Sequence, residues 1–170
     1  DCIGHFTQDV FDSSMILQVT AGQDICDSTT APIPVENYSE NLDRGVKNLK
    51  IGIPKEYMVS SLSPKIKLLT INAIKLLEKL GAEIVDISLP HTKYAVATYY
   101  VIVPSEISSN LARFDGNRFG FGRDRFGDEA KRRIMLGTYT LSAGYYDAFY
   151  LKAMKVRTLI KEDFEKAFSK

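Results

Sequence analysis

Three consecutive basic residues, Lys131-Arg132-Arg133, stand at the start of a helical apolar pattern. Neighbouring residues of a helix point about 100° apart, so at most one of the two arginines can face inward with the apolar stripe. An inward-facing Arg133 would offer a fork of N–H donors that suits a substrate carboxylate. Arg133 is therefore a candidate binding residue, and a solvated charge run is the alternative interpretation.

A second candidate is a Gly- and Arg-rich segment, residues 115–127, in which guanidinium groups alternate with phenylalanine rings. Arginines can contact a phosphate backbone while aromatic rings stack on bases, so one interpretation is a nucleic-acid contact. The other is a loop whose rings pack beneath it and whose arginines stay in solvent. The glycine spacing fits neither common phosphate-binding motif. The residues concerned are Arg113, Arg118, Arg123, Arg125, Phe114, Phe119, Phe121 and Phe126.

Other catalytic patterns are incomplete. The two histidines, His5 and His91, are too few for a His-rich metal centre, and each flanks an expected element boundary, where a surface or capping role is the simpler interpretation. There is no GxSxG nucleophile elbow and no pair of carboxylates at a fixed catalytic spacing. Tyrosines are dense in the second half, where we expect core positions with the hydroxyl bonded. The residues alone predict no complete active site.

Composition indicates an ordinary folded protein. The chain has 170 residues with a formal charge of +1, 45% hydrophobic and 25% charged, which excludes disordered and collagen-like classes. Two cysteines, Cys2 and Cys26, without CxxC spacing favour a reducing compartment. No signal peptide is visible, and the longest apolar run, Tyr94 to Val103, is shorter than the roughly 20 residues that span a bilayer. We expect a cytoplasmic protein, or one of an organellar matrix if the source is a eukaryote, that makes no membrane contact.

The first half predicts a strand–helix–strand unit. A helix over residues 7–21 is expected, with Thr7 as N-cap, followed by a loop and a short helical turn over residues 35–42. Alternation predicts strands over residues 49–54 and 82–90, and the apolar stripe between them predicts a helix from Ser63-Pro64 to Gly81. Parallel pairing is the expected geometry, so the fold class is α/β, with Gly52 marking close packing.

The second half predicts helices over residues 94–114, 128–142 and 145–168, with residues 115–127 as a mobile loop between the first two. No sharp composition shift places a domain boundary. We therefore expect one domain over residues 1–170, with a sheet-forming half (1–90) and a helical half (91–170).

Several stretches resemble the amidase-signature family, and within it the A subunits of the tRNA-dependent aspartyl/glutamyl amidotransferases. The longest runs from Lys131 to Tyr139, with the sequence KRRIMLGTY, and is followed by LSAGYYDA. Further similar blocks lie at residues 52–57, 89–95, 105–116 and 155–160. The resemblance covers essentially the whole chain and implies part of an amidase-signature fold, a mixed β-sheet flanked by helices.

The resemblance implies a glutaminase chemistry. In the family a Ser–cis-Ser–Lys triad attacks an amide carbonyl, which makes histidine dispensable. The amide substrate is glutamine. The partner, the B subunit, uses the released ammonia with ATP and Mg²⁺ to convert mischarged Glu-tRNA(Gln) or Asp-tRNA(Asn) to the amidated form. A small C subunit holds the assembly together. The resemblance thus implies a carbon–nitrogen ligase with tRNA bound mainly through the B subunit and no cofactor bound by this chain.

The resemblance assigns site residues only in part. It places the triad before residue 1, so no catalytic residue is carried over, and this chain alone is expected to be inactive. It places further family sequence after Phe168 and a longer insertion near Gly122. Two positions, Tyr99 and Arg133, match family residues that contact the glutamine. The alternatives are another amidase-signature amide hydrolase and a non-catalytic interaction domain.

Overall fold

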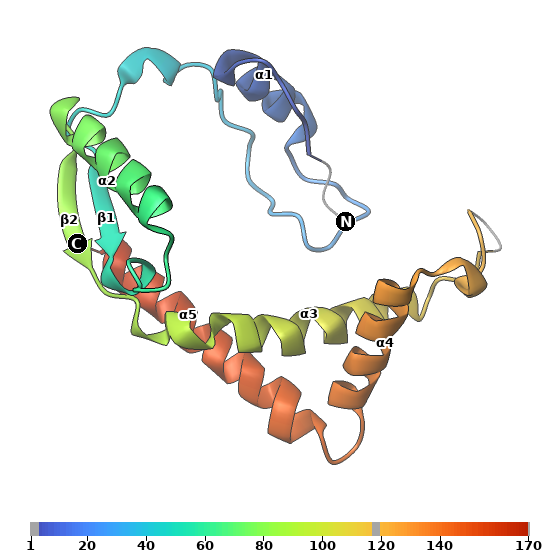
Figure 1. Ribbon diagram of the computed structural model, residues 1–170. Helices are drawn as coiled ribbons and strands as arrows, with labels where there is room; N and C mark the ends of the chain where they lie inside the picture. The colour runs from blue at the N-terminus through green and yellow to red at the C-terminus, as the bar shows by residue number, and fades with distance from the viewer. Residues whose placement is uncertain (1–3, 117–119, 170) are drawn as a thin grey trace. The chain divides into compact units, whose positions relative to one another are not determined.

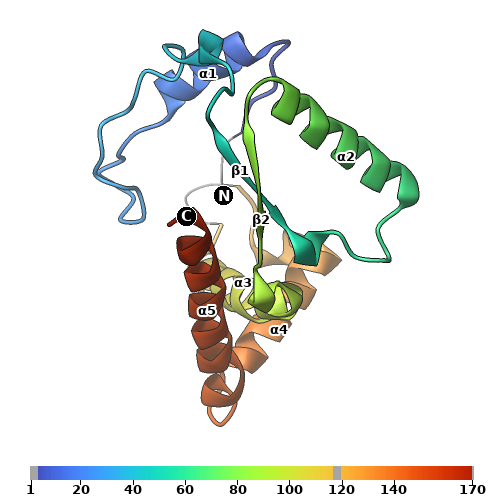
Figure 2. The same ribbon diagram turned by 90° about the vertical axis from the view of Figure 1, so that its left-hand side faces the viewer.

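The computed structural model describes residues 4–116 and 120–169 (Figures 1 and 2). The chain divides into two compact units, residues 1–50 with 72–83 and residues 51–71 with 84–170. The α/β prediction is confirmed, whereas the assignment of residues 1–170 to one domain stays a prediction. The elements are α1 (Val10–Thr20), β1 (Lys50–Pro54), α2 (Pro64–Lys79), β2 (Glu83–Ile87), α3 (Ala95–Leu111), α4 (Asp128–Leu141) and α5 (Lys152–Phe168).

The predicted strand–helix–strand unit is present as β1, α2 and β2. The two strands pair in a two-stranded sheet and run in the same direction in Figure 1. Gly81 ends α2 in the left-handed region at φ 95°, and the N–H of Ala82 donates back to the carbonyl of Leu77, the cap that the sequence predicts. A Cβ on Gly52 would lie 2.8 Å from Cδ1 of Ile87, so the predicted close packing at Gly52 is also confirmed.

The apolar stripe that predicts α2 is largely exposed in this chain. Ile66, Leu69 and Leu76 are between 54% and 60% exposed, whereas Ile71 and Ile74 are half-buried. α2 therefore carries apolar residues on more than one side, and a helix of this kind needs cover on more than one side. Two strands supply too little surface for that.

Two boundaries in the first unit differ from prediction. The N-cap of α1 is Asp9, whose Oδ1 accepts the N–H of Asp12 at 2.8 Å; the predicted cap, Thr7, instead donates its hydroxyl to the Asp9 carbonyl. The helical turn predicted over residues 35–42 is wrong. The structure has a 3₁₀ turn at Leu42–Arg44, because the Asn37 side chain accepts hydrogen bonds two residues ahead and holds a non-helical turn.

The three helices predicted for the second half are confirmed as α3, α4 and α5. The third differs at its start, since residues Tyr146–Leu151 form a π-helix and α5 begins only at Lys152. A π-helix closes its hydrogen bonds one residue further along than an α-helix and is found frequently at functional sites. α3 contains Pro104 in its interior.

Two carboxylates hold the turn between β2 and α3. Glu56 accepts hydrogen bonds from the Ser88 hydroxyl at 2.6 Å and from the Leu89 N–H at 2.9 Å. Asp163 of α5 accepts the His91 N–H at 2.9 Å and lies 3.0 Å from the His91 Nδ1 atom. Leu89 between them is only 1% exposed. This turn therefore joins the sheet to the helices through a buried apolar anchor with a polar bond on each side.

Candidate carboxylate-binding site

Arg133 faces α3, whereas its neighbour Arg132 faces solvent. The Arg133 side chain is 21% exposed and the Arg132 side chain 74%. Both lie in the second turn of α4, where the angular step of about 100° between neighbours turns one inward and the other outward. The structure agrees with the expectation that at most one arginine of the pair faces inward, and that arginine is Arg133; its role in binding stays a prediction.

The Arg133 guanidinium is held by one carboxylate and two aromatic rings. Its Nε donates to Oε1 of Glu129 at 2.7 Å, and its Nη1 donates to the Tyr99 hydroxyl at 3.2 Å. The guanidinium carbon lies 5.8 Å from the Tyr99 ring centroid and 5.4 Å from that of Tyr100, within cation–π range. The two rings meet edge to face at 5.3 Å. Tyr99 and Arg133, which the resemblance predicts to contact the same glutamine, are thus direct neighbours.

Protonation in this cluster is fixed at neutral pH. The hydrogen bond from Arg133 lowers the pKa of Glu129, with the positive charges of Arg132 and Arg133 adding to the effect. The hydrogen bond to Glu129, followed by that to Tyr99, raises the pKa of Arg133 above its already high value. Glu129 is therefore an anion and Arg133 a cation under all physiological conditions, which suits the binding of an anionic group rather than proton transfer.

A tight crossing of α3 and α4 sets this arrangement. A Cβ on Gly137 would overlap the Pro104 carbonyl oxygen, so only glycine permits this approach of the backbones. Beside it the Ser105 and Thr140 hydroxyls bond at 2.7 Å in a buried pair. Figure 1 shows the two helices crossing near the end of α3. Gly137 lies one turn after Arg133, so the crossing determines how far Arg133 reaches toward Tyr99.

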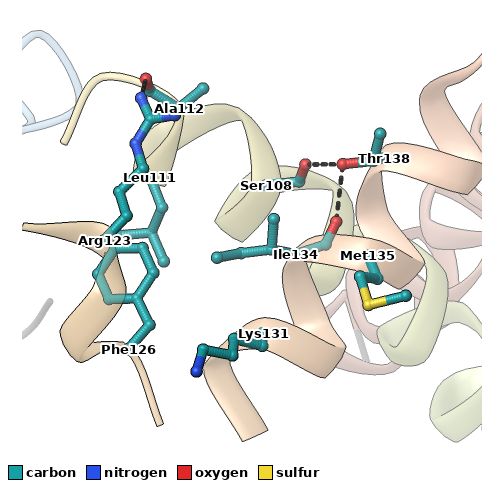
Figure 3. A pocket seen from close by; sticks show the side chains of 9 residues that line it. All are labelled: Ser108, Leu111, Ala112, Arg123, Phe126, Lys131, Ile134, Met135 and Thr138. Atoms are coloured by element: carbon teal, nitrogen blue, oxygen red, sulfur yellow. Dashed lines mark hydrogen bonds between the residues drawn. The ribbon is translucent and has the colours of Figure 1, made fainter. Parts of the chain in front are cut away.

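A separate hollow of about 490 Å³ is lined by residues of the same helix pair and of the segment between the two helices (Figure 3). Its lining is mainly apolar, and the Ser108 and Thr138 hydroxyls in it bond to each other at 2.8 Å. Neither Tyr99 nor Arg133 lines it, so it is not the cluster described above. The lining residues are Ser108, Leu111, Ala112, Arg123, Phe126, Lys131, Ile134, Met135 and Thr138.

The Arg- and Phe-rich segment is partly folded onto the end of α3. Arg123 donates to the carbonyl oxygens of Phe114 and Ala112, and the Phe114 and Phe126 rings lie 5.4 Å apart. Phe121 is 71% exposed, with Arg125 5.5 Å above its ring. The segment therefore contains both side chains that pack on α3 and side chains that are exposed to solvent. Arg118 and Phe119 lie outside the described residues, and the expected mobility of residues 115–127 stays a prediction.

The remaining candidates have local partners. His5 bonds to the Ser13 hydroxyl, and His91 is half-buried against Asp163 at an element boundary, as the capping interpretation expects. Cys26 is exposed, and Cys2 lies outside the described residues. In residues 4–116 and 120–169 no three His, Cys, Asp or Glu side chains are arranged to hold a metal ion. In the same ranges no helix combines the length and apolar character needed to cross a membrane.

Glu129 was not predicted from the sequence as part of this cluster. The spacing of Glu129 is the sequence feature that could have indicated its contact with the arginines. Glu129 precedes Arg132 by three residues and Arg133 by four, and residues at these intervals share a helix face. A single acidic residue before a basic run is common on solvated helices. The pair becomes part of a candidate site only because the Arg133 side chain faces α3.

Comparison with known proteins assigns the chain to a family. The profile of the family described as Amidase matches residues 1–170. The chain belongs to the amidase family. Two relatives of this amidase chain are bacterial proteins, each named as the A subunit of a glutamyl-tRNA(Gln) amidotransferase. The protein from Sulfurihydrogenibium sp. (strain YO3AOP1) is 55% identical over an alignment of 185 positions that covers 100% of this chain. The protein from Geobacter metallireducens is 54% identical and covers 99% of it.

A solved structure supports the same assignment of this amidase chain. The crystal structure of the glutamyl-tRNA(Gln) amidotransferase A subunit from Thermotoga maritima matches 96% of this chain with a TM-score of 0.72 and 39% identity. This amidase chain spans 38% of the length of the two relatives above and 34% of the Thermotoga chain. The first alignment is longer than the 170 residues of this chain, so that relative carries residues that this chain lacks.

Proposed function

We propose that this chain is part of the glutaminase subunit of a tRNA-dependent amidotransferase. The observation that carries the proposal is the identity of 54–55% over 99–100% of the chain to proteins named as A subunits of glutamyl-tRNA(Gln) amidotransferases. The complete enzyme would release ammonia from glutamine and use it to convert mischarged Glu-tRNA(Gln), or Asp-tRNA(Asn), to the amidated form. Residues 1–170 alone would be inactive.

Within that reaction Arg133 and Tyr99 would bind the glutamine. The geometry supports this role because Arg133 is a permanent cation whose guanidinium is oriented by Glu129 and Tyr99. A free amino acid carries an α-carboxylate that distinguishes it from a peptide side chain, and a forked guanidinium is the group that recognises a carboxylate with two parallel hydrogen bonds. The nucleophile and the proton-relaying groups would come from family residues outside this chain.

The partners and cofactors follow from the same proposal. The ammonia would pass to a B subunit, which would bind the mischarged tRNA and use ATP and Mg²⁺, and a small C subunit would support the assembly. Free ammonia becomes protonated in water, so exclusion of solvent between the two reactions is a chemical requirement. We propose the cytoplasm as the compartment, since the two relatives above are bacterial proteins.

The test is ammonia release from glutamine by the complete amidotransferase. Wild-type enzyme should hydrolyse glutamine, and Arg133→Lys should lose at least about tenfold in kcat/KM, since an ammonium replaces a bidentate fork. A loss within about twofold would contradict the carboxylate role of Arg133. Preference for an amide other than glutamine, with no dependence on tRNA, would show a different amidase-family hydrolase instead.

A further inference from the structure

We propose that Glu129 is a positioning residue that determines which edge of the Arg133 guanidinium meets the substrate carboxylate. This inference rests on the proposed function and deepens it, because it assigns the orientation of the bound amino acid. Glu129 accepts the Arg133 Nε at 2.7 Å through Oε1 and the Arg132 Nη1 at 2.6 Å through Oε2. One carboxylate therefore binds both arginines of the pair and separates them.

The donors of Arg133 show why this selects an edge. A guanidinium has five N–H bonds, which form a side edge that includes Nε and an end edge made by Nη1 and Nη2. Glu129 occupies Nε, and the Tyr99 hydroxyl accepts one hydrogen from Nη1. The remaining donors, in the described part of the chain, lie on Nη1 and Nη2. A carboxylate that approaches Arg133 can therefore take two parallel bonds only at the end edge.

The charges of the cluster favour the same outcome. Two guanidinium groups and one carboxylate leave a net positive charge, so an incoming anion is still attracted. Without Glu129 the two arginines would repel each other and the Nε edge would open. Glutamine would then have to order the Arg133 side chain when it binds, which weakens the ground state and the transition state alike. Such a loss raises the KM and leaves kcat unchanged.

The experiment compares Glu129→Gln with Asp128→Asn in the complete amidotransferase. Both substitutions remove one negative charge from the first turn of α4, but the Asp128 carboxylate has no hydrogen bond or ion pair within residues 4–116 and 120–169. We expect Glu129→Gln to raise the KM for glutamine about tenfold with kcat within about twofold, and Asp128→Asn to change neither by more than about twofold. Equal effects of the two variants would overturn the proposal.

A double-mutant cycle with Arg133→Lys separates positioning from a general structural role. If Glu129 acts through Arg133, Glu129→Gln should change the KM by less than about twofold in the Arg133→Lys background. Additive effects, or a loss confined to kcat, would overturn the proposal while leaving the glutaminase function intact. A wild-type complex that releases no ammonia from glutamine would instead refute the proposed function itself. Thermal unfolding of each variant controls for loss of folded protein.

Discussion

At the scale of single residues, Tyr99 and Tyr100 contact the same guanidinium in different ways. Tyr99 uses its hydroxyl oxygen at 3.2 Å and its ring, whereas Tyr100, within the part of the chain that the structure describes, uses its ring. Cation–π attraction depends on the ring and survives loss of the hydroxyl. The hydrogen bond to the Tyr99 hydroxyl is lost with that hydroxyl. Replacement of each tyrosine by phenylalanine therefore gives a matched pair of variants.

Tyr99→Phe should raise the KM for glutamine about fivefold in the complete enzyme, the change that one typical hydrogen bond represents, because Arg133 loses an acceptor. Tyr100→Phe keeps the ring and should leave the KM within about twofold. Steady-state ammonia release over a range of glutamine concentrations measures both. Equal effects of the two variants would show that the hydroxyl of Tyr99 has no special role.

Sequence patterns predict part of this cluster, for identifiable reasons. The helical pattern allows at most one arginine of the pair to face inward, and a family resemblance selects Arg133 and Tyr99. The sequence does not predict that Glu129 contacts Arg133 in this cluster. An acidic residue four positions before a basic one occurs on many exposed helices, so the spacing alone does not single out this pair. The edge of the guanidinium that remains open is a property of three side chains from two helices, which no local pattern contains.

At the scale of elements, the crossing of α3 and α4 depends on one position without a side chain. Gly137→Ala would place a methyl group onto the Pro104 carbonyl oxygen and 2.5 Å from the carbonyl carbon, and both atoms belong to backbone that cannot rotate away. We expect the free energy of unfolding to fall by about 3 kcal/mol, the upper range for overpacked contacts. Differential scanning calorimetry of the complete protein measures the loss.

Gly127→Ala is the control for that substitution. Gly127 is the N-cap of α4, and a Cβ built there has no atom within 4 Å. Replacement should cost only about 1 kcal/mol, because alanine is a poorer N-cap than glycine. If the Gly137→Ala variant melted at the same temperature as the Gly127→Ala variant, α3 and α4 could separate without loss of stability.

The polar bonds around the β2–α3 turn predict a pH dependence. Burial alone would raise the pKa of Asp163, but the hydrogen bonds from the His91 N–H and ring lower it overall. A lowered carboxyl pKa stabilises the fold at pH values above the usual value of 3.8, and that contribution is lost as the pH falls through the lowered value. Asp163→Asn should therefore reduce stability at pH 6 and flatten its decline toward pH 3.

Urea unfolding of the complete protein between pH 6 and pH 3 measures this dependence. Glu162→Gln is the matched control, since Glu162 is the adjacent residue of α5 and forms an exposed ion pair with Lys166 at 3.8 Å. Exposed pairs of this kind contribute little, so the control should follow the wild-type pH profile. The contribution assigned to Asp163 would be refuted by an Asp163→Asn profile that ran parallel to the wild type.

At the scale of the whole molecule, the described residues bury few apolar side chains. Within residues 4–116 and 120–169 the buried hydrophobic core consists of Ala82, Leu89, Ile102 and Ala153, whereas apolar residues of α1 and α2 are widely exposed. The sequence predicts these helices correctly from periodicity, but periodicity states which side of a helix is apolar and not what covers that side. The exposed stripe of α2 is the clearest case, because the chain spans 38% of the length of its relatives.

Residues 1–170 expressed alone should therefore bind a hydrophobic dye such as ANS and unfold without a sharp thermal transition. Large exposed apolar patches and loose packing produce that combination. Dye fluorescence and near-UV circular dichroism, compared with the complete protein at equal concentration, provide the measurement. A cooperative transition without dye binding would show that these residues form a stable unit by themselves.

The π-helix at Tyr146–Leu151 has a consequence for how this protein can vary in evolution. A π-helical turn holds one more residue per hydrogen-bonded ring than an α-helical turn, so it can lose a residue and close as ordinary α-helix. Deletion of Ala148 would leave α5 as it is but rotate the aromatic residues before it, including Tyr145, by about 100° around the helix axis. Homologues that lack one residue in this segment should therefore have an ordinary α-helix here and present a different set of rings.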